Sequence, residues 1–469
     1  MKITQSINKR RTEYHALLPL PKAMVHIMTV NVDYCRVGIM LDCLNDMGFR
    51  QNSGMELTTH NMQLIQQELI NKGMLFKTTR GISCPESIRR EALWNMLLED
   101  SFRQTVTVLL KHIPLPDTTK QTNPFENYQQ VIRSFQIALF SHKSTKEINT
   151  IENYYAYHYF RDDYRDNNLY HSILNNPFSG EIMDKIHPEI RLKVALSLLE
   201  RTGELLEPAT EILHYIITSF PAEVLGKSAT IKLINYHLLC GDKSLAHSLA
   251  ANLSEDLKPE QLSRTAWLES ISGNHQKADE LFEQSIRYIN KRTGKRKCFL
   301  QSYAGIFHLL SLLGTGGNTA LNKAINYIDI AKNDQYPLSS MTEAMRPVFE
   351  DRLGLASGEL HLPDMGLLDN TDAPLPFFLS NLFWAWTNPS EAGQNISRIS
   401  YIRDKAKKNN YTWLAAELSA LLEFLGHEKE QNRDLSAKLH KLCNTVSCVH
   451  LVKDQPKWEK TLHALLHIV

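Results

Sequence analysis

One stretch of the sequence ends like a phosphate-binding loop, Gly226-Lys227-Ser228. Such a loop needs a second glycine five residues earlier, because its backbone amides must curl around phosphate oxygens. Pro221 occupies that position, and no strand pattern precedes it. We therefore interpret the triplet as the beginning of a helix, and we predict no nucleotide cofactor.

A group of soft metal ligands lies near the end of the sequence, at His440, Cys443, Cys448 and His450. Four residues separate the two cysteines, a spacing that some zinc sites use. We nevertheless interpret the group as part of a packed helix and predict no metal site, because its neighbours are apolar: Leu439, Leu442, Val446, Val449 and Leu451.

Nucleophilic catalysis has no readable pattern in this sequence. There is no Gly-x-Ser-x-Gly turn, and the 19 histidines are dispersed without a paired acid or nucleophile. His427-Glu428 lacks the second histidine that a zinc-protease helix needs. We predict no catalytic residue, and we expect no enzyme activity to reside in this chain.

The strongest local charge lies at Arg287–Lys297, a run with the sequence RYINKRTGKRK and no acidic residue. Each cation can neutralise a phosphate and release counterions, which makes binding depend steeply on salt. Thr293-Gly294 is expected to break the helix and start a turn. We predict a basic loop that binds nucleic-acid backbone; a solvated loop and an acidic protein partner are the alternatives. The six candidates are Arg287, Lys291, Arg292, Lys295, Arg296 and Lys297.

Residues 33–84 contain two helical patterns followed by two short apolar runs. A first helix is expected over residues 34–47 and a second over residues 59–72, each followed by a glycine. The apolar runs 74–76 and 82–84 flank a polar turn. Helix, helix, strand, turn and strand is the order of a winged helix, which we predict here. Its expected buried faces are Val37, Leu41 and Leu44 in the first helix, and Met62, Ile65 and Leu69 in the second.

The second of these helices, with Thr58 or Thr59 as its N-cap, would carry polar side chains towards DNA. Asparagine and glutamine can read base edges, whereas phosphate contacts usually supply most of the affinity. Residues 1–80 contain ten Lys or Arg against six Asp or Glu, so the positive surplus is modest. Because winged helices also bind proteins, both DNA and a protein are possible partners of this helix. The candidates are His60, Asn61, Gln63, Gln67 and Asn71 on the helix, with Lys77 and Arg80 on the wing.

From about residue 188 to residue 359 the sequence has the pattern of stacked helical hairpins. Stretches beginning at Gly241 and Gly273 can be aligned, and each has an alanine five residues later, Ala246 or Ala278. Their offset of 32 residues is close to the 34 of tetratricopeptide units, so we predict a degenerate tetratricopeptide-like solenoid. A third, looser copy begins near Gly317. The residues expected to pack around the turns are Trp267, Leu268, Ile271 and Phe282.

An aromatic-rich stretch has two interpretations. It can form a stacking platform for single-stranded nucleic acid, or the core face of a helix whose hydroxyls reach the surface. The nearby Asp162, Asp163 and Asp166 would repel phosphates, which favours the core. The residues of the stretch are Tyr154, Tyr155, Tyr157, Tyr159, Phe160, Tyr164 and Tyr170.

Two proline-containing segments divide the chain. Residues 113–124 hold three prolines without apolar periodicity, and residues 363–376 mix Pro, Asp, Asn and Gly. Prolines end helices, so we interpret both segments as linkers. We predict a mainly α-helical protein with an N-terminal winged-helix domain (1–112), a degenerate tetratricopeptide-like α-solenoid (125–362) and a C-terminal helical domain (377–469).

Composition sets outer limits on function. The 469 residues are 43% hydrophobic and 22% charged, which fits a folded protein. The net charge is +1, so no overall field attracts nucleic acid or an acidic membrane, and such binding needs a local patch. Seven scattered cysteines favour a reducing compartment, and we expect neither a signal peptide nor a membrane span. We predict a cytoplasmic location and no membrane partner.

The motif RTGKRK at Arg292–Lys297 precedes an apolar helix that contains Tyr303, Gly305, Phe307 and Leu309 to Leu313. This combination resembles the N-terminal region of long bacterial Swi/Snf-type helicase-like proteins. In that family a winged-helix segment and a helical-repeat region precede a two-lobed ATP-dependent DNA translocase. The ending from Trp458 to Leu466 is similar to the helical stretch that leads towards that motor.

This sequence departs from the family because no motor follows: it has no phosphate loop, no Asp-Glu-x-His box and no arginine-finger motif. The resemblance implies a non-catalytic arm that engages DNA or a protein partner, with the translocase motor in the same polypeptide or encoded separately. Two alternatives remain. One is a stand-alone transcription regulator whose winged helix reads an operator and whose repeats sense a peptide or protein. The other is a structural adaptor that binds no nucleic acid.

Overall fold

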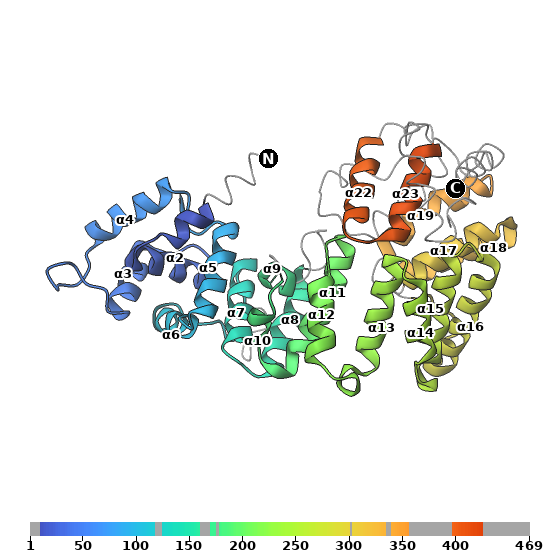
Figure 1. Cartoon of the computed structure of the whole chain (residues 1–469), viewed down its shortest axis with the longest axis horizontal. Helices are drawn as coiled ribbons and strands as arrows, with labels where there is room; N and C mark the ends of the chain where they lie inside the picture. The colour runs from blue at the N-terminus through green and yellow to red at the C-terminus, as the bar shows by residue number, and fades with distance from the viewer. Residues whose placement is uncertain are drawn as a thin grey trace. The chain divides into compact units, whose positions relative to one another are not determined.

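The computed structural model describes seven stretches of the chain: residues 10–117, 124–159, 169–174, 178–300, 303–333, 339–355 and 396–424. These residues form a mainly helical protein with one two-stranded sheet (Figure 1). None of their helices has both the length and the apolar character needed to cross a bilayer. The chain divides into two compact units, which we call unit 1 (Met1–Leu198) and unit 2 (Leu199–Val469). That boundary coincides with neither predicted linker, and the division into three domains stays a prediction.

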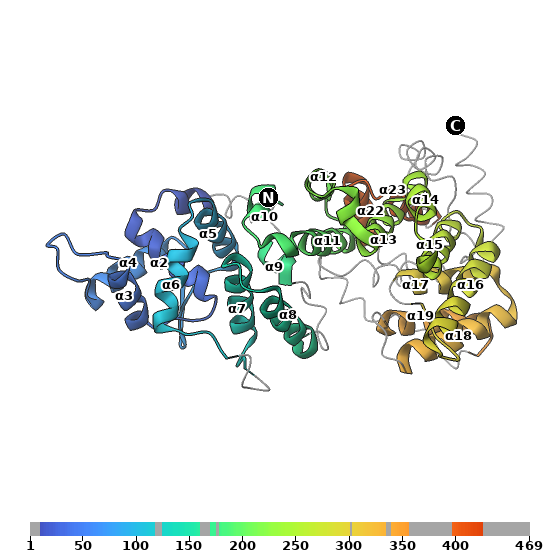
Figure 2. The ribbon, with the colours of Figure 1, turned by 90° about the horizontal axis from the view of Figure 1, so that it is seen from below.

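Unit 1 contains helices α2 (Pro19–Asn31), α3 (Val37–Asp46), α4 (Thr59–Asn71), α5 (Glu86–Leu98), α6 (Phe102–His112), α7 (Tyr128–Phe140), α8 (Thr145–Tyr159), α9 (Leu169–Leu174), α10 (Gly180–Asp184) and the first part of α11 (Pro188–Glu204), with strands β1 (Phe76–Thr78) and β2 (Gly81–Ser83). Helix α2 lies at the centre and contacts α3, α4, α5, α6 and α7 (Figure 2). Ten of its 13 residues are buried, because the run Ala23–Val30 is mostly apolar. This central helix lies outside the region that predicted a winged helix.

The strand pair of unit 1 is extended by one further residue. Strands β1 and β2 are antiparallel, with Lys77 opposite Ile82. Cys35 forms an isolated antiparallel bridge with Ile82: the Cys35 amide donates to the Ile82 carbonyl at 2.9 Å, and the Ile82 amide donates back at 3.1 Å. The helix predicted from Tyr34 therefore begins only at Val37, because the backbone at Cys35 is committed to this bridge.

The buried positions of α3 and α4 agree in part with the predicted faces. Leu44, Met62 and Leu69 are buried, whereas Val37, Leu41 and Ile65 are only half-buried and Met40 and Cys43 fill the core of α3 instead. The predicted strands at 74–76 and 82–84 are wrong by one or two residues. The amides of Met74 and Leu75 both donate to the Leu69 carbonyl, so these residues end α4 and the strand begins after them.

The first part of the predicted linker packs against α7. Arg133 is only 4% exposed, and its Nη2 donates to the carbonyl oxygens of Ile113 and Pro114. Burial lowers the pKa of Arg133 to about 10. Asn127 Nδ2 donates to Asp33 Oδ2 at 3.0 Å, which also ties α7 to the loop before α3. The prolines of this segment therefore end α6 without separating it from α7.

A hydrogen-bond chain runs from the core of unit 1 to its surface. His26 Nε2 lies 2.9 Å from the Tyr14 hydroxyl, which donates to Asn95 Oδ1 at 3.0 Å. His26 Nε2 is therefore the donor to the Tyr14 oxygen. Asn95 Nδ2 then donates to Glu99, whose carboxylate also accepts from Lys22. Burial, with a smaller contribution from Lys22, lowers the pKa of His26 to about 4.

This histidine should make unit 1 less stable in acid. The folded state keeps His26 neutral down to pH 4, whereas the unfolded chain takes up a proton near the ordinary pKa of about 6.5. The unfolded state therefore binds more protons in that window, and stability is lost as the pH falls through it. We expect a loss of about 2–3 kcal/mol between pH 7 and about pH 4.5, measured by urea unfolding. His26→Gln, which keeps a donor but does not titrate, should flatten the profile; an equally steep profile in that variant would contradict the assignment.

Unit 2 contains the end of α11, then α12 (Thr210–Ser219), α13 (Ala222–Cys240), α14 (Lys243–Ala251), the 3₁₀ turn η1 (Glu255–Leu257), α15 (Lys258–Ser270), α16 (His275–Thr293), α17 (Tyr303–Thr315), α18 (Gly317–Asn333), α19 (Ser339–Arg352), α22 (Ile396–Lys408) and α23 (Thr412–Phe424). Helices α13 and α14, α15 and α16, and α17 and α18 form successive hairpins. Helices α13, α15, α17 and α19 contact one another in turn, so the hairpins are stacked.

The predicted turns of these hairpins are confirmed. Gly241 and Gly273 have left-handed φ angles of +78° and +79°, which end α13 and open the α15–α16 turn. Ala246 and Ala278 are buried, as expected where two helices approach closely. The looser third copy also corresponds to a helix, since α18 begins at Gly317.

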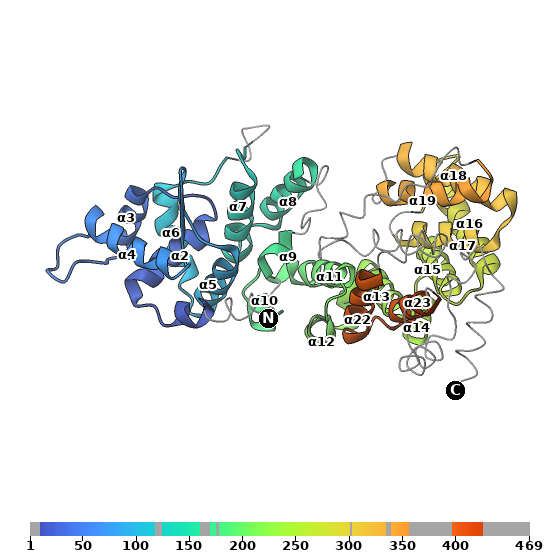
Figure 3. The same cartoon turned by 90° about the horizontal axis from the view of Figure 1, so that it is seen from above.

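The last described hairpin, α22 and α23, packs on the same stack; Figure 3 shows α23 beside α13. The Tyr411 hydroxyl is directed at the carbonyl oxygens of Thr202 and Glu207, at 3.2 and 2.8 Å. A Cβ atom at Gly241 would lie 2.8 Å from the Cβ of Trp413, so α23 approaches the end of α13 as closely as a glycine permits. Residues 396–424 are thus part of the core of unit 2.

Candidate nucleic-acid interface

The basic cluster, defined as the six cations between Arg287 and Lys297, combines a helix end with the segment that follows. Arg287, Lys291 and Arg292 lie in the last turns of α16, so the prediction of a loop is wrong for this half. The helix persists because its buried side, including Phe282 and Ile286, keeps helical spacing up to this point. It ends at Thr293, where Gly294 takes a left-handed φ of +69°, as predicted.

All six side chains of the basic cluster are exposed. Arg292 Nη2 lies 3.4 Å from Glu260 Oε1, so this member of the cluster forms an ion pair. Among the residues that the structure describes, no carboxylate lies within ion-pair distance of four members: Arg287, Lys291, Arg296 and Lys297. Cations at a helix C-terminus interact favourably with its dipole, which helps the helix carry this charge.

The cluster is anchored to the core on both sides. Within α16, Ser285 Oγ donates to the Pro259 carbonyl oxygen at 2.7 Å, which fixes the helix to the start of α15. Directly after Lys297, the residues Cys298, Phe299 and Leu300 are buried. The segment that carries Lys295, Arg296 and Lys297 is therefore short and held at both ends.

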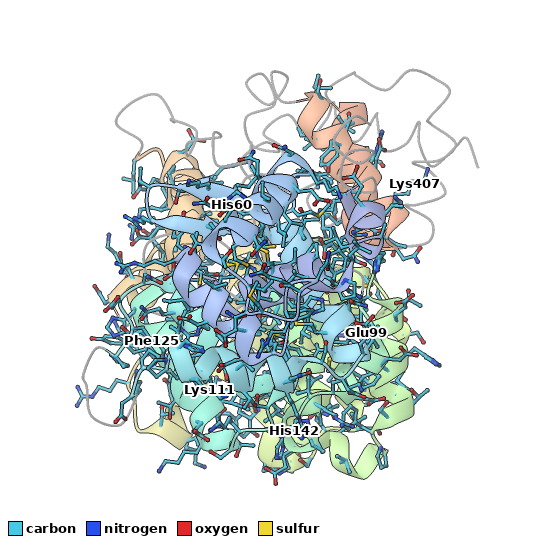
Figure 4. The ribbon with its side chains drawn as sticks, turned by 90° about the vertical axis from the view of Figure 1, so that its left-hand side faces the viewer. His60, Glu99, Lys111, Phe125, His142 and Lys407 are labelled. Carbon is cyan, nitrogen blue, oxygen red and sulfur yellow. The ribbon has the colours of Figure 1, made fainter. Side chains whose placement is uncertain are left out.

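Helix α4 exposes a largely uncharged face. His60, Gln63, Gln67 and Asn71 are exposed as predicted, and so are Lys77 and Arg80 on the hairpin; Figure 4 marks His60 on α4. The helix has no Lys or Arg, and its one acid, Glu68, pairs with Lys72 at 2.6 Å.

Two of the predicted base-reading amides already have partners. Asn61 closes a capping box with Thr58: its Oδ1 accepts from the Thr58 amide at 3.1 Å, and its own amide donates to the Thr58 hydroxyl. Gln67 Nε2 donates to Asn71 Oδ1 at 2.9 Å. These bonds orient both amides towards α4 and its cap and occupy part of their hydrogen-bonding capacity.

The same side of unit 1 exposes apolar residues that the sequence analysis did not single out. Leu64 of α4 is 61% exposed, and Met55 in the loop before it is 63% exposed. Exposed apolar side chains suit a protein partner better than a phosphate backbone. The sequence could have indicated the exposure of Leu64, because this residue lies outside the predicted buried face formed by Met62, Ile65 and Leu69.

The aromatic stretch separates into buried and exposed residues. Tyr155 and Tyr170 are buried, which confirms the core interpretation for them, and Tyr154 packs edge-on to Phe125 with ring centroids 4.8 Å apart. For Tyr157 that interpretation is wrong, since its side chain is 64% exposed on α8. The side chain of Tyr159, together with Phe160 and Tyr164, lies outside the described residues, and so does the group from His440 to His450.

A polar cluster that the sequence analysis missed joins three helices of unit 2. Asp279 and Glu283 of α16 face His308 of α17, with donor and acceptor atoms within 4.8 Å of one another, a geometry that can hold a metal ion. Lys323 of α18 supplies a cation instead: its Nζ lies 2.8 Å from Asp279 and 2.9 Å from Glu283. Tyr327 donates to Glu283 at 2.5 Å.

Hydrogen bonds and ion pairs connect the polar groups of this cluster. Burial alone would raise the pKa of Asp279, but hydrogen bonds from His308 and Lys323 outweigh it and the pKa is lowered. Burial lowers the pKa of His308, which favours a neutral ring. We therefore interpret the cluster as a structural bridge between α16, α17 and α18. Hydrogen-bonded partners in the cluster are up to 44 residues apart, which is why no local motif indicates it.

Gly226-Lys227-Ser228 lies at a kink. Gly226 has φ +59° and ψ 179° inside α13, so the helix is interrupted there and resumes at Lys227. The interpretation as the beginning of a helix thus holds for the second segment of α13. Lys227 is paired with Asp256 of η1.

Comparison of the chain with protein-family models, with curated proteins and with solved structures finds no match. The function of the chain is therefore inferred from the geometry of these surfaces.

Proposed function

We propose that this chain is a non-catalytic arm that holds nucleic-acid backbone on the basic cluster of unit 2. The observation that carries the proposal is the exposure of all six cations, four of which have no ion pair among the described residues. Unpaired surface cations at fixed spacing attract a polyanion because each phosphate contact releases condensed counterions. The net charge of the whole chain is only +1, so the attraction is local.

In this proposal the arm serves an ATP-dependent DNA translocase of the Swi/Snf type. Support comes from the resemblance of RTGKRK at Arg292–Lys297 and of the apolar helix that follows it. The chain would bind DNA or a protein partner, and a motor in the same polypeptide or a separate one would hydrolyse ATP. No nucleotide or metal cofactor is proposed for the chain itself.

We further propose that α2 to β2 form a winged helix and that α13 to α19 form a tetratricopeptide-like solenoid. The first is supported by the order α2, Cys35 bridge, α3, α4, β1 and β2. The second is supported by the stacked hairpins and by the 32-residue offset between Gly241 and Gly273.

A second candidate function concerns α4, which we propose as a protein-docking surface within the same arm. The specific observation is the exposure of Leu64 on a helix without cations and of Met55 in the loop before it. The alternative of a transcription regulator needs α4 to read bases with side chains that include Asn61 and Gln67. Both make hydrogen bonds within α4 or its cap, which favours docking over reading.

The test of the basic cluster is a triple variant, Lys295→Gln, Arg296→Gln and Lys297→Gln. Removing three phosphate contacts should weaken binding to a labelled DNA oligonucleotide by about 10- to 100-fold near 0.1 M salt. Fluorescence anisotropy measures this affinity directly. Thermal unfolding of the variant should stay close to that of the unaltered protein, because the three side chains are exposed.

The matched control removes the same charge from another helix end of unit 2. Lys405→Gln, Lys407→Gln and Lys408→Gln alter the last turn of α22. This control should bind the oligonucleotide nearly as tightly as the unaltered protein. Equal losses in the two triple variants would mean that only net charge matters, and that outcome would remove the basic cluster as a site.

A further inference from the structure

Tyr288 lies near the beginning of the basic cluster, directly after Arg287, with its ring exposed. Its exposed fraction is 46%, and no ring contact or hydrogen bond of its side chain occurs within the described part of the chain. Residues three and four positions apart share a face of a helix, so Tyr288 stands beside Lys291 and Arg292. Arg287 precedes it and is also exposed. The exposed aromatic ring therefore has cationic residues next to it on α16.

The outward face of α16 changes along the helix. Near the beginning it carries Lys277 and Glu280, and Lys277 pairs with Glu269 at 2.5 Å. From Gln284 to Thr293 the helix has no acidic residue. The one acid just before this segment, Glu283, is bound to Lys323 on the opposite side. The end of α16 therefore offers only cationic, amide and aromatic groups to a ligand.

We infer that the nucleic acid held by the basic cluster is single-stranded, with a base stacked on Tyr288 and the flanking phosphates bound by its neighbours. This inference rests on the proposed function. The bases of a duplex cover one another's faces, so only an unpaired base can lie on a side-chain ring. Lys291 and Arg292 follow Tyr288 by three and four residues and lie about 4.5–6 Å further along the helix axis, so they stand next to a nucleotide stacked on the ring.

The exposed ring of Tyr288 distinguishes a single strand from a duplex, although the cations attract both. A duplex would contact the cations but could not stack a base on the exposed ring. An acidic protein can pack on the ring as well, so competition by polyglutamate is needed to distinguish it from nucleic acid. A single strand gains binding energy from two sources: any of its bases can stack on the ring, and its phosphates contact the cations. The exposed Tyr157 of α8 offers a comparison outside the basic cluster: its described neighbours include Asn153, Tyr154 and His158.

The experiment compares a labelled oligothymidylate of about 12 nucleotides with the matching duplex. We expect the unaltered protein to prefer the single strand. Tyr288→Leu should weaken single-strand binding by about 5- to 150-fold and leave duplex binding unchanged. Tyr288→Phe should retain most of the affinity, because a phenyl ring stacks as well. Tyr157→Leu, the control at an exposed tyrosine, should bind like the unaltered protein.

Two results would overturn the inference: equal affinity for single strand and duplex, or full single-strand affinity in Tyr288→Leu. Polyglutamate that competes as well as oligothymidylate would identify an acidic protein as the ligand class and would also overturn it. If the triple variant at Lys295, Arg296 and Lys297 loses both DNA forms while Tyr288→Leu loses neither, the proposed function stands and this inference fails. If no variant changes any affinity, both fail.

Discussion

A Gly81→Ala variant is expected to lose about 3–5 kcal/mol of the stability of unit 1. Gly81 has φ +136°, which residues with a side chain rarely adopt. A Cβ atom there would lie 2.7 Å from the carbonyl oxygen of Cys35, and a backbone atom cannot rotate away. Because Cys35 and Ile82 exchange two backbone hydrogen bonds, the clash falls on the bridge that joins the hairpin to α3.

The control is Gly54→Ala, which separates backbone strain from the clash. Gly54 also has a positive φ, +82°, but a Cβ atom there meets nothing within 4 Å. We expect a cost of about 1 kcal/mol. Urea unfolding measures both costs, and hydrogen exchange of peptides containing Cys35 and Ile82 should accelerate only in Gly81→Ala. Equal costs for the two variants would contradict the close approach of Gly81 to Cys35.

The same variant also separates the candidate functions. The hairpin belongs to unit 1, whereas the basic cluster belongs to unit 2. Oligonucleotide binding should therefore survive in Gly81→Ala, even as the hairpin loses its bridge. Loss of sequence-specific binding in this variant would instead favour the transcription regulator.

The second large effect is expected for Trp267→Ala, which should destabilise unit 2 by about 3–5 kcal/mol. Trp267 is 1% exposed, and its ring stacks on Phe307 with centroids 4.7 Å apart. Phe307 in turn contacts Trp413 at 5.4 Å, so one ring series links α15, α17 and α23. Truncation leaves a cavity that these large rings cannot fill by small shifts.

Leu268→Ala provides the comparison, since its side chain is only half-buried in the next position of α15. We expect a cost of about 1 kcal/mol, close to the average for point substitutions. Thermal unfolding followed by circular dichroism measures both. If Trp267→Ala unfolds no earlier than Leu268→Ala, the aromatic series does not hold the stacked helices together.

Several elements of the fold could be predicted because their signals are local. Gly241 and Gly273 predict turns, because these turns need a positive φ angle that glycine adopts easily. Ala246 and Ala278 predict close contacts between helices, because their side chains are small. The end of α16 at Thr293 follows from Gly294 in the same way. The exposure of the six cations follows from the cost of burying unpaired charge.

Other features depend on residues far apart in the sequence. The bridge of Cys35 with Ile82 shortened the predicted helix at Tyr34, and no residue near Cys35 indicates a partner 47 positions away. The sequence did not identify helix α2 as the core of unit 1. Its residues are apolar on all sides, so they show neither the alternation of a strand nor the one-sided periodicity of a surface helix. Asn61 was assigned to base reading, although Thr58-x-x-Asn61 also matches the spacing of a capping box.

The candidate site was found in outline and refined by the structure. The sequence identified the six cations but placed all of them in a loop. The helical positions of Lys291 and Arg292, three and four residues after Tyr288, bring these cations beside its ring, which linear reading of RYINKRTGKRK does not display. The exposed ring beside these cations is the reason that we infer a site for single-stranded nucleic acid, whereas the cations alone indicate only a polyanion site.

The salt dependence of oligonucleotide binding tests the central claim most directly, because each phosphate contact contributes to the slope of log affinity against log salt. With four to six cations engaged on a single strand, we expect a slope of about −3 to −4 between about 50 and 300 mM salt. The triple variant at Lys295, Arg296 and Lys297 should reduce it by about 2. A slope near zero, or one that the triple variant leaves unchanged, would contradict the account.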